Sequence, residues 1–396
     1  MASIDTAPRA PQRSFSLNDP FFRGIVYQVI TAAIVISSII WIVNNTAANL
    51  KAQNKTTGFD FLWKTSGFNI SFTLFPFDRS SYYWEAFLVG LTNTILVAII
   101  GIIFATILGF TIGIARLSSN YLISRLATIY VETIRNIPLL LQLFFWYFAV
   151  LKTMPAVRDS IELPFDTFIN QRGLFVPKPI FDDQFPWVWL GLAIGVAAWI
   201  AISVWAKQRL FNTGKRFPVF ISGLAVTIVA VGIVWVVSGA AVTFDLPVLN
   251  RFNFKGGVEL PPELVALVFG LSIYTAAFIA ETVRAGIQSV SHGQTEAAQA
   301  LGLKEGDRLR LVIVPQAMRV IIPPLTSQYL NLTKNSSLGA AIGYPELVNV
   351  FTGTTLNQTG RAIEVIAMTM LVYLILSLST SAIMNWYNAR VALVER

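Results

Sequence analysis

Long stretches without any charged residue limit this chain more than any other feature of its sequence. One runs from residue 24 to residue 50, and others lie between Glu85 and Arg116, Asp183 and Lys207, Arg216 and Asp245, Glu263 and Glu281, and Glu364 and Arg390. An apolar helix of about 20 residues spans the roughly 30 Å hydrocarbon core of a bilayer. Each stretch therefore predicts one transmembrane helix.

Two further apolar segments are interrupted by charge. The segment at about 123–151 carries Glu132 and Arg135, and the segment at about 320–342 carries Lys334. Ionisable groups inside a bilayer are rare and often functional, so both segments predict membrane helices with polar positions of interest. The expected fold class is an all-α integral membrane protein with about eight transmembrane helices.

The composition supports this class and excludes several functions. Only 13% of the residues are charged, and the mean hydropathy is +0.63. The net charge of +8 is ascribed to cytoplasmic loops, so membrane lipid and not nucleic acid is the expected partner. The chain has no cysteine and one histidine, His292, which excludes disulfides and thiolate metal sites, and no bound metal is expected.

Motifs for enzyme chemistry are missing from the sequence as well. It contains no Gly-x-x-x-x-Gly-Lys-Ser/Thr phosphate loop, no His-Glu-x-x-His zinc helix and no Gly-x-Ser-x-Gly nucleophile elbow. We therefore expect no enzyme activity, no ATPase site and no cofactor on this chain.

Basic residues near the helix ends predict the orientation. One group lies in the segment 284–319, and a second follows the predicted helix at about 186–206, namely Lys207, Arg209, Lys215 and Arg216. Such residues are enriched in short cytoplasmic loops, and an even number of spans then places both termini in the cytoplasm. The first helix is interpreted as a retained anchor, with a cleaved signal peptide as the weaker alternative.

A short sequence echo joins two of the predicted membrane helices. Glu132-Thr133-Ile134-Arg135 resembles Glu281-Thr282-Val283-Arg284. The i,i+3 spacing places each glutamate beside its arginine on one helical face, which predicts two intramembrane ion pairs. Their role is either to lower the energy of charge in the membrane or to act directly in function.

The stretch from Ser289 to Pro324 is unusually polar for a connection between membrane helices. Its Glu, Gln, Ala and Leu residues favour a short helix, Gly302 favours a stop or bend, and a second helix reaches Pro315. The pattern predicts a rigid helical elbow outside the membrane. The alternative is an amphipathic helix that lies at the membrane surface.

This elbow resembles the signature loop of the membrane subunits of binding-protein-dependent ABC importers. The match consists of Glu-Ala-Ala at 296–298, Gly302 after three further residues, and Pro315 beyond an apolar pair. The flanks, at 278–287, 293–294, 315–317, 334–338 and 132–142, are similar to the polar amino acid permeases. The resemblance covers about residues 86–150 and 262–388.

The resemblance implies a type I permease core, a set of partners and several site residues. The ATPase-docking surface would comprise Glu296, Ala297, Ala298, Gly302 and Pro315. The implied partners are a second homologous permease chain in a heterodimer, two ATP-binding cassette subunits that use ATP and Mg, and a periplasmic amino acid binding protein. The implied location is the bacterial inner membrane.

The chain departs from the five-helix layout common in this family. The expected order is a cytoplasmic tail at 1–23, an extra helix at 24–44, a periplasmic segment at 45–85, the first core part at 86–150, an insertion at 151–261, the second core part at 262–388 with the coupling loop at 289–319, and a tail at 389–396. The insertion combines periplasmic segments with two helices at about 186–206 and 218–240. This enlarged layout is similar to the general L-amino acid permeases of alpha-proteobacteria.

Polar positions on the seventh predicted helix are candidates for substrate contact. Asn331, Lys334, Asn335 and Leu338 recur at i, i+3, i+4 and i+7 and so share one helical face. Lys334 could attract an α-carboxylate, or pair structurally with a carboxylate of a partner chain. The family often has an acid where Asn335 stands, so the site is either completed by the partner or incomplete.

The sequence thus favours the permease subunit of an ATP-driven importer for L-amino acids. The first alternative is a secondary transporter, which predicts repeated halves and broken helices, but only the short echo suggests a repeat. The second alternative is a structural membrane protein without transport activity.

Overall fold

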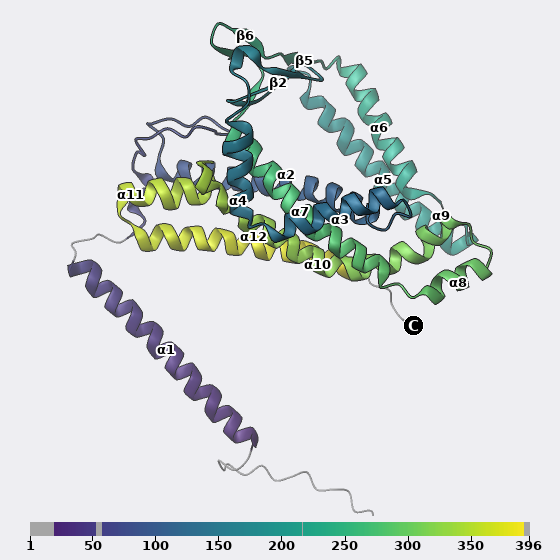
Figure 1. The fold of residues 1–396 in the computed structure, drawn as a ribbon, viewed down its shortest axis with the longest axis horizontal. Coiled ribbons are helices and arrows are strands. Elements are labelled where there is room, and N and C mark those ends of the chain that lie inside the picture. Colours follow the sequence, from purple (N-terminus) through teal and green to yellow (C-terminus); the bar gives the residue numbers. More distant parts are fainter. Residues whose placement is uncertain (1–19, 53–57, 216, 392–396) are drawn as a thin grey trace, which may run out of the picture.

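A computed structural model describes residues 20–52, 58–215 and 217–391 (Figure 1). The long helices are α1 (Pro20–Ala52), α2 (Tyr83–Ala115), α3 (Tyr121–Asn136), α5 (Pro186–Thr213), α6 (Val219–Ser238), α7 (Pro262–Gln288), α10 (Val314–Asn335) and α12 (Ala362–Val391). Shorter helical segments are η1 (Asp60–Trp63), α4 (Leu139–Phe144), η2 (Phe145–Leu151), η3 (Val157–Asp159), α8 (His292–Ala300), α9 (Glu305–Arg308), η4 (Leu309–Ile313), η5 (Ser336–Ile342), η6 (Val348–Thr355) and α11 (Leu356–Thr359). The all-α membrane class is therefore confirmed.

The spans of the described residues match the predicted apolar segments, with two changes. Seven helices are long and apolar enough to cross a membrane, and an eighth candidate is the pair formed by α3 and the helix at Leu139–Leu151. This pair is bent by 106° at its break, where Pro138 lacks a backbone N–H. The seventh predicted helix begins earlier than expected, because the helical chain is continuous from Glu305 to Ile342.

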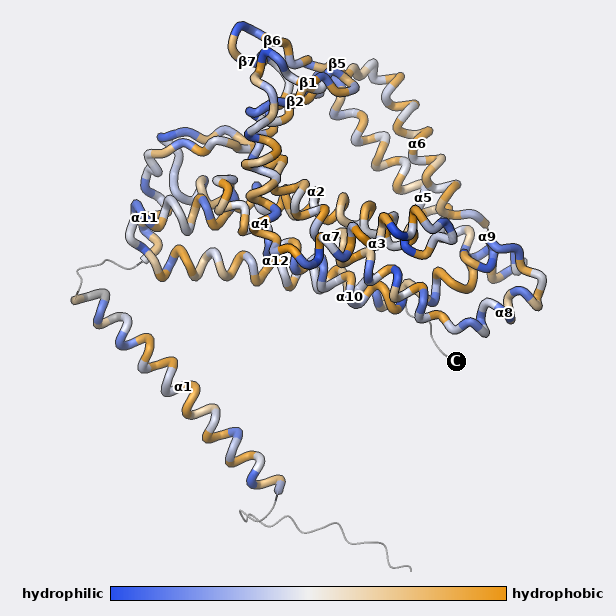
Figure 2. Tube along the Cα trace, in the orientation of Figure 1, coloured by the Kyte–Doolittle hydropathy of each residue, from blue (hydrophilic) through white to orange (hydrophobic). Residues whose placement is uncertain are grey.

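The core of the molecule is the contact between α2 and α7, with α10 beside them. Buried side chains of α7 such as Leu271 and Ile279 lie at its centre. A Cβ atom added to Gly109 of α2 would lie 2.5 Å from the Ile279 side chain, so the two helices can approach this closely only with glycine there. Small residues allow such close packing of membrane helices. Figure 2 shows apolar residues along all of these helices.

Short strands outside the helices were not predicted from the sequence. They are β1 (Ile161–Leu163), β2 (Thr167–Asn170), β3 (Gly173–Val176), β4 (Lys178–Phe181), β5 (Val242–Asp245), β6 (Val248–Asn250), β7 (Asn253–Lys255) and β8 (Val258–Leu260). An antiparallel sheet has the order β1-β2-β3-β8, and β4 pairs with β5 and β6 with β7. We call residues 157–181 and 242–260 the β platform.

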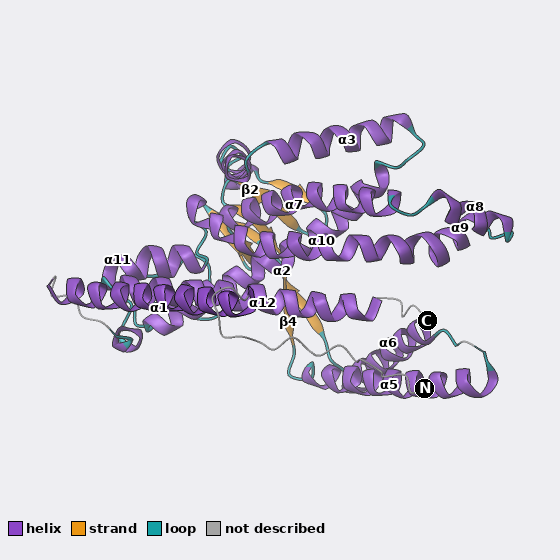
Figure 3. Ribbon diagram, turned by 90° about the horizontal axis from the view of Figure 1, so that it is seen from below, coloured by secondary structure: helices purple, strands orange, loops and turns teal. Residues whose placement is uncertain are grey.

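The two inserted helices form a hairpin that leaves the β platform (Figure 1). The predicted helices at about 186–206 and 218–240 correspond to α5 and α6, although α5 continues to Thr213. Gly195 of α5 packs against Thr227 of α6, and Gly223 of α6 packs against Trp199 of α5. The loop at the far end of the hairpin lies at the same end of the molecule as α8 and α9 (Figures 1 and 3). The two basic segments that predicted the orientation therefore lie at one end.

Candidate functional site

The predicted elbow is formed by α8, a sharp bend and α9. Gly302 has a φ of +71°, a left-handed conformation that favours glycine. The Leu303 N–H donates to the Ala298 carbonyl at 3.1 Å, and the Gly302 N–H donates to the Gln299 carbonyl at 2.9 Å. These two bonds are the Schellman arrangement that ends a helix. The bend predicted at Gly302 is therefore present.

Side chains of α8 divide between an exposed and a buried face. Glu296 is exposed and its Oε1 atom lies 3.0 Å from Nδ1 of His292. Ala297 is also exposed, whereas Ala298 is buried with 3% of its surface accessible. Leu301 is 80% exposed at the bend. The face available to a partner thus comprises Glu296, Ala297 and Leu301, and Ala298 lies beneath it.

The second helix of the elbow does not end near Pro315. Instead α9, η4 and α10 follow one another without a break, and Pro315 is exposed in the first turn of α10. The π-helical turn η4 ends at Ile313, two residues before this proline, which lacks an N–H and is tolerated where a helix segment begins. A hydrogen bond of 3.2 Å from Gln316 to Gln294 links α10 to α8. Displacement of the elbow would therefore pass directly into α10.

Three of the four charged residues of the sequence echo, together with Arg116, form one cluster rather than two pairs. Glu281 accepts hydrogen bonds from Arg116, the residue that follows α2, and, at 2.5 Å, from Arg284 of its own helix, and Arg135 of α3 lies 3.5 Å away. The predicted contact between Glu281 and Arg284 is present. The predicted pair of Glu132 with Arg135 is wrong: Glu132 is exposed and belongs to none of the ion pairs in the described part of the chain. Arg135 turns to Glu281, which joins α2, α3 and α7.

The predicted polar face of α10 points away from the core of this chain. Asn331 and Lys334 are exposed and Asn335 is half-buried, whereas Leu332 and Thr333 are buried. Within the described ranges, no carboxylate lies within ion-pair distance of Lys334. Because α10 ends at Asn335 and continues as a 3₁₀ helix, Leu338 does not extend the same α-helical face.

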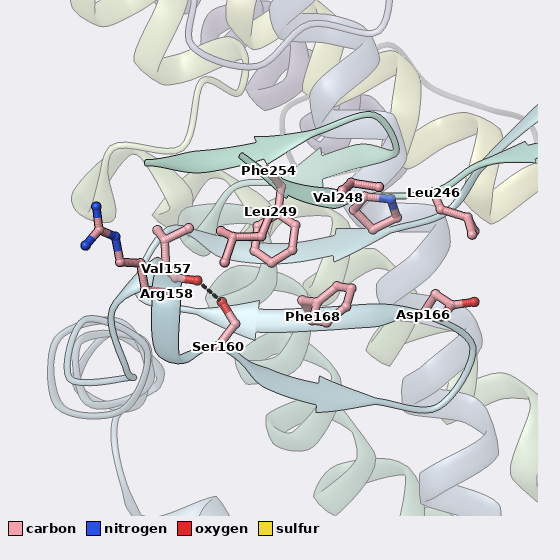
Figure 4. Close-up of a pocket in the computed structure, with 10 residues that line it drawn as sticks. Val157, Arg158, Ser160, Asp166, Phe168, Leu246, Val248, Leu249 and Phe254 are labelled. Carbon is pink, nitrogen blue, oxygen red and sulfur yellow. Dashed lines mark hydrogen bonds between the residues drawn. The ribbon is translucent and has the colours of Figure 1, made fainter. Parts of the chain in front are cut away.

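The β platform has a pocket of about 300 Å³ that the sequence did not reveal. Phe168 and Phe254 stack with ring centroids 4.8 Å apart, and Arg158 and Asp166 lie toward opposite ends of the pocket (Figure 4). At the neighbouring turns Phe165 is 90% exposed and Phe252 is 73% exposed. Phe165 and Asp166 have positive φ values, 64° and 50°, a conformation that aspartate adopts more readily than the bulky phenylalanine. The platform thus presents aromatic side chains around an apolar pocket.

We find no metal-binding site among the residues that the structure describes. No group of three or more His, Asp or Glu side chains there could hold a metal ion.

Comparisons with known proteins identify similar chains. Residues 200–393 match the family described as "Binding-protein-dependent transport system inner membrane component". The chain is 50% identical to the general L-amino acid transport system permease protein AapQ of Rhizobium johnstonii, over 100% of this chain and 99% of AapQ. It is 48% identical to the putative amino-acid ABC transporter permease protein YhdX of Escherichia coli, over 97% and 98% of the two chains. It is 40% identical to the glutamate/glutamine/aspartate/asparagine transport system permease protein BztB of Rhodobacter capsulatus, over 100% of each.

Proposed function

The chain belongs to the inner-membrane components of binding-protein-dependent transport systems, and from this premise we propose that it passes L-amino acids through the membrane as one permease subunit of an ATP-driven importer. The substrate class follows from the printed names of relatives that match almost the full chain. AapQ is named for general L-amino acids, and BztB for glutamate, glutamine, aspartate and asparagine.

The observation that carries this proposal is the exposed elbow and its continuity with α10. The exposed face at Glu296, Ala297 and Leu301 is available to an ATPase subunit. The continuous helix would carry the movement of that subunit to the polar face at Asn331 and Lys334. Two conformations that bind ATP and substrate unequally are the minimum requirement for such coupling.

The polar face of α10 is proposed to line the substrate pathway together with a second, homologous permease chain. Its exposure supports this assignment, because a lysine against lipid is costly and the described residues of this chain offer Lys334 no carboxylate. The guanidinium cluster around Glu281 is proposed to be structural, since it ties α3 to α2 and α7.

The remaining partners are proposed from the same premise. Two ATP-binding cassette subunits would bind ATP and Mg, so this chain itself would need no cofactor and no catalytic residue. A periplasmic amino acid binding protein would meet the exterior surface, where the β platform offers its pocket and the exposed side chains of Phe165 and Phe252.

Substitution of the bend residue tests the coupling proposal. Gly302→Val places a β-branched residue at a φ of +71°, although nothing lies within 4 Å of its Cβ, so the expected defect is in the backbone of the elbow and not in packing. In proteoliposomes that contain the full complex, ATP-driven uptake should be lost while the chain still inserts and assembles. Gly306→Val is the matched control, because Gly306 lies in α9 at a helical φ with open space around it. Normal uptake by Gly302→Val would contradict the assignment of the elbow.

A further inference from the structure

Within the described residues, α1 is the helix with the longest continuous exposed stretch. Every residue from Tyr27 to Asn45 is exposed, and Figure 1 shows α1 splayed away from the body of the molecule. Its side chains are mostly apolar and bulky, including Ile36, Ile40 and Val43. A helix that faces lipid does not need to pack against another part of the protein. A packing partner for α1 can therefore be assigned only with evidence from the rest of the fold.

The chain that follows α1 is fastened at the amino end of α12. The Gly58 N–H donates to Glu364 at 2.6 Å, and Arg361 forms an ion pair with Asp60 at 2.9 Å. Arg361 and Glu364 are 7% and 8% exposed, whereas the Asp60 side chain is 56% exposed, so the attachment is buried on the side of α12. Residues 53–57 alone separate α1 from this attachment, and even an extended chain of that length reaches only about 20 Å. The Ala52 end of α1 therefore stays close to the start of α12.

An apolar groove starts close to the same attachment. It has a volume of about 390 Å³ and lies between α2, with Phe87, Leu91 and Ile95, and α12, with Met368, Leu371 and Ile375. Met368 comes six residues after the first residue of α12, or about 9 Å along the axis. Residues 53–57, which we call the tether, are thus long enough to allow α1 to reach the groove. They are too short to let the Ala52 end of α1 lie far from the groove.

The direction of α1 also fits this groove. In Figure 1 α1 and α12 diverge from their left-hand ends, whereas in the view of Figure 3 α1 overlies α12. A rotation of α1 in one plane about its Ala52 end would therefore lay α1 along α12. Because Ala52 and Ala362 lie at the same end, the two helices would be antiparallel. Their candidate spans of 27 and 29 residues also match in length.

We propose that α1 packs antiparallel to α12 in the groove between α2 and α12 of the same chain. A tether this short gives α1 an effective concentration in the millimolar range at the groove, which favours it over a second copy of the chain. The gain comes from van der Waals packing, since lipid and the groove are equally apolar. The assignment goes beyond the transport function and does not depend on it.

Cysteine cross-linking in the assembled complex tests the docking directly, because the natural chain has no cysteine. Single cysteines are placed at each position from Ile36 to Val43 and combined with Leu371→Cys in the groove. Met370→Cys is the matched control: it lies at the same depth and is 67% exposed, but one residue along a helix points about 100° away, and Met370 is not part of the groove.

The proposal expects intrachain cross-links to Leu371→Cys at positions of α1 that recur every three or four residues, and few or none to Met370→Cys. Equal yields with both partners, or no product at any α1 position, would overturn it. When the two cysteines are placed on separate, differently tagged copies, a product linking the copies would assign the groove to a second chain and would also overturn the proposal.

Discussion

Glu346 is a carboxylate with no exposed surface in the connection between η5 and η6. Burial raises its pKa to about 7, although it accepts hydrogen bonds from the N–H groups of Val348 and Asn349 and from the Tyr373 hydroxyl. The folded chain therefore binds this proton more tightly than the unfolded chain, in which the pKa is near 4.5. Stability should fall as the pH rises from about 4.5 to about 7, and should not fall further from this cause above that range.

Thermal unfolding of the complex across this pH range measures the effect. At about 1.4 kcal/mol per pH unit, the difference between a pKa of 4.5 and one of about 7 corresponds to a loss of folding free energy on the order of 3 kcal/mol. Glu346→Gln cannot ionise and should flatten the pH profile, with some loss at low pH because an amide offers one acceptor oxygen where the carboxylate uses two. Glu162→Gln, at an exposed position of β1, should leave the profile as it is. An unchanged slope in Glu346→Gln would contradict this account.

Substitution of Lys334 distinguishes a role in substrate binding from a structural role. If its ammonium group binds the α-carboxylate, Lys334→Met removes a charge-assisted hydrogen bond of roughly 1.5–3 kcal/mol, and the KM for uptake should rise about tenfold or more with assembly intact. Lys215→Met, in the exposed basic loop after α5, is the control. Unchanged KM and maximal rate would eliminate the ligand role, whereas loss of assembly would favour a structural pair with the partner chain.

For single residues, the sequence predicted local backbone geometry better than tertiary contacts. Gly302 and the Glu-Ala-Ala run sit in a local pattern, so the bend could be predicted. The burial of Ala298 could not be predicted, because it depends on tertiary packing, such as the contact of α8 with η4. The partners of Glu281 could not be predicted either, since Arg116 and Arg135 come from two other helices and the i,i+3 pattern shows only Arg284.

The α5–α6 hairpin depends on glycines at its interface. A Cβ at Gly195 would lie 2.6 Å from the Thr227 backbone, which cannot move aside as a side-chain tip can. Gly195→Leu should force the helices apart at a cost of about 1–3 kcal/mol and lower the unfolding temperature of the complex. In the same hairpin Gly232 has nothing within 4 Å of its Cβ, so Gly232→Leu should have little effect. Equal behaviour of the two variants would contradict the packing described here.

The sequence predicted the long helices but not the short strands. Long helices follow from uncharged apolar stretches, and α5 and α6 were found in this way. Strands of three or four residues, such as β1 and β6, carry too little alternation to be recognised. Two of the pairings in the β platform, β3 with β8 and β4 with β5, also join strands that lie on either side of the α5–α6 hairpin in the sequence. The unbroken course of α9 into α10 was also missed, because Pro315 usually marks a helix boundary.

The orientation of the whole molecule is open to a direct test. The basic loops predict that Lys215 and Gln294 lie in the cytoplasm. They predict that Phe165 of the β platform, which is 90% exposed, lies on the opposite side of the membrane. Cysteines introduced singly at these positions should react with a membrane-impermeant thiol reagent in intact cells only at Phe165. The other two should react after the membrane is permeabilised. The reverse pattern would overturn the predicted orientation, including cytoplasmic termini.

The central claim is that this chain imports amino acids only as part of an ATP-driven assembly. The direct measurement is uptake of radiolabelled L-glutamate into proteoliposomes that contain both permease chains, with or without the ATPase subunits, with loaded binding protein on one side and ATP on the other. Accumulation should require the ATPase subunits and ATP together. Accumulation without the ATPase subunits, driven by an ion gradient, would contradict the claim and would identify the chain as a secondary transporter.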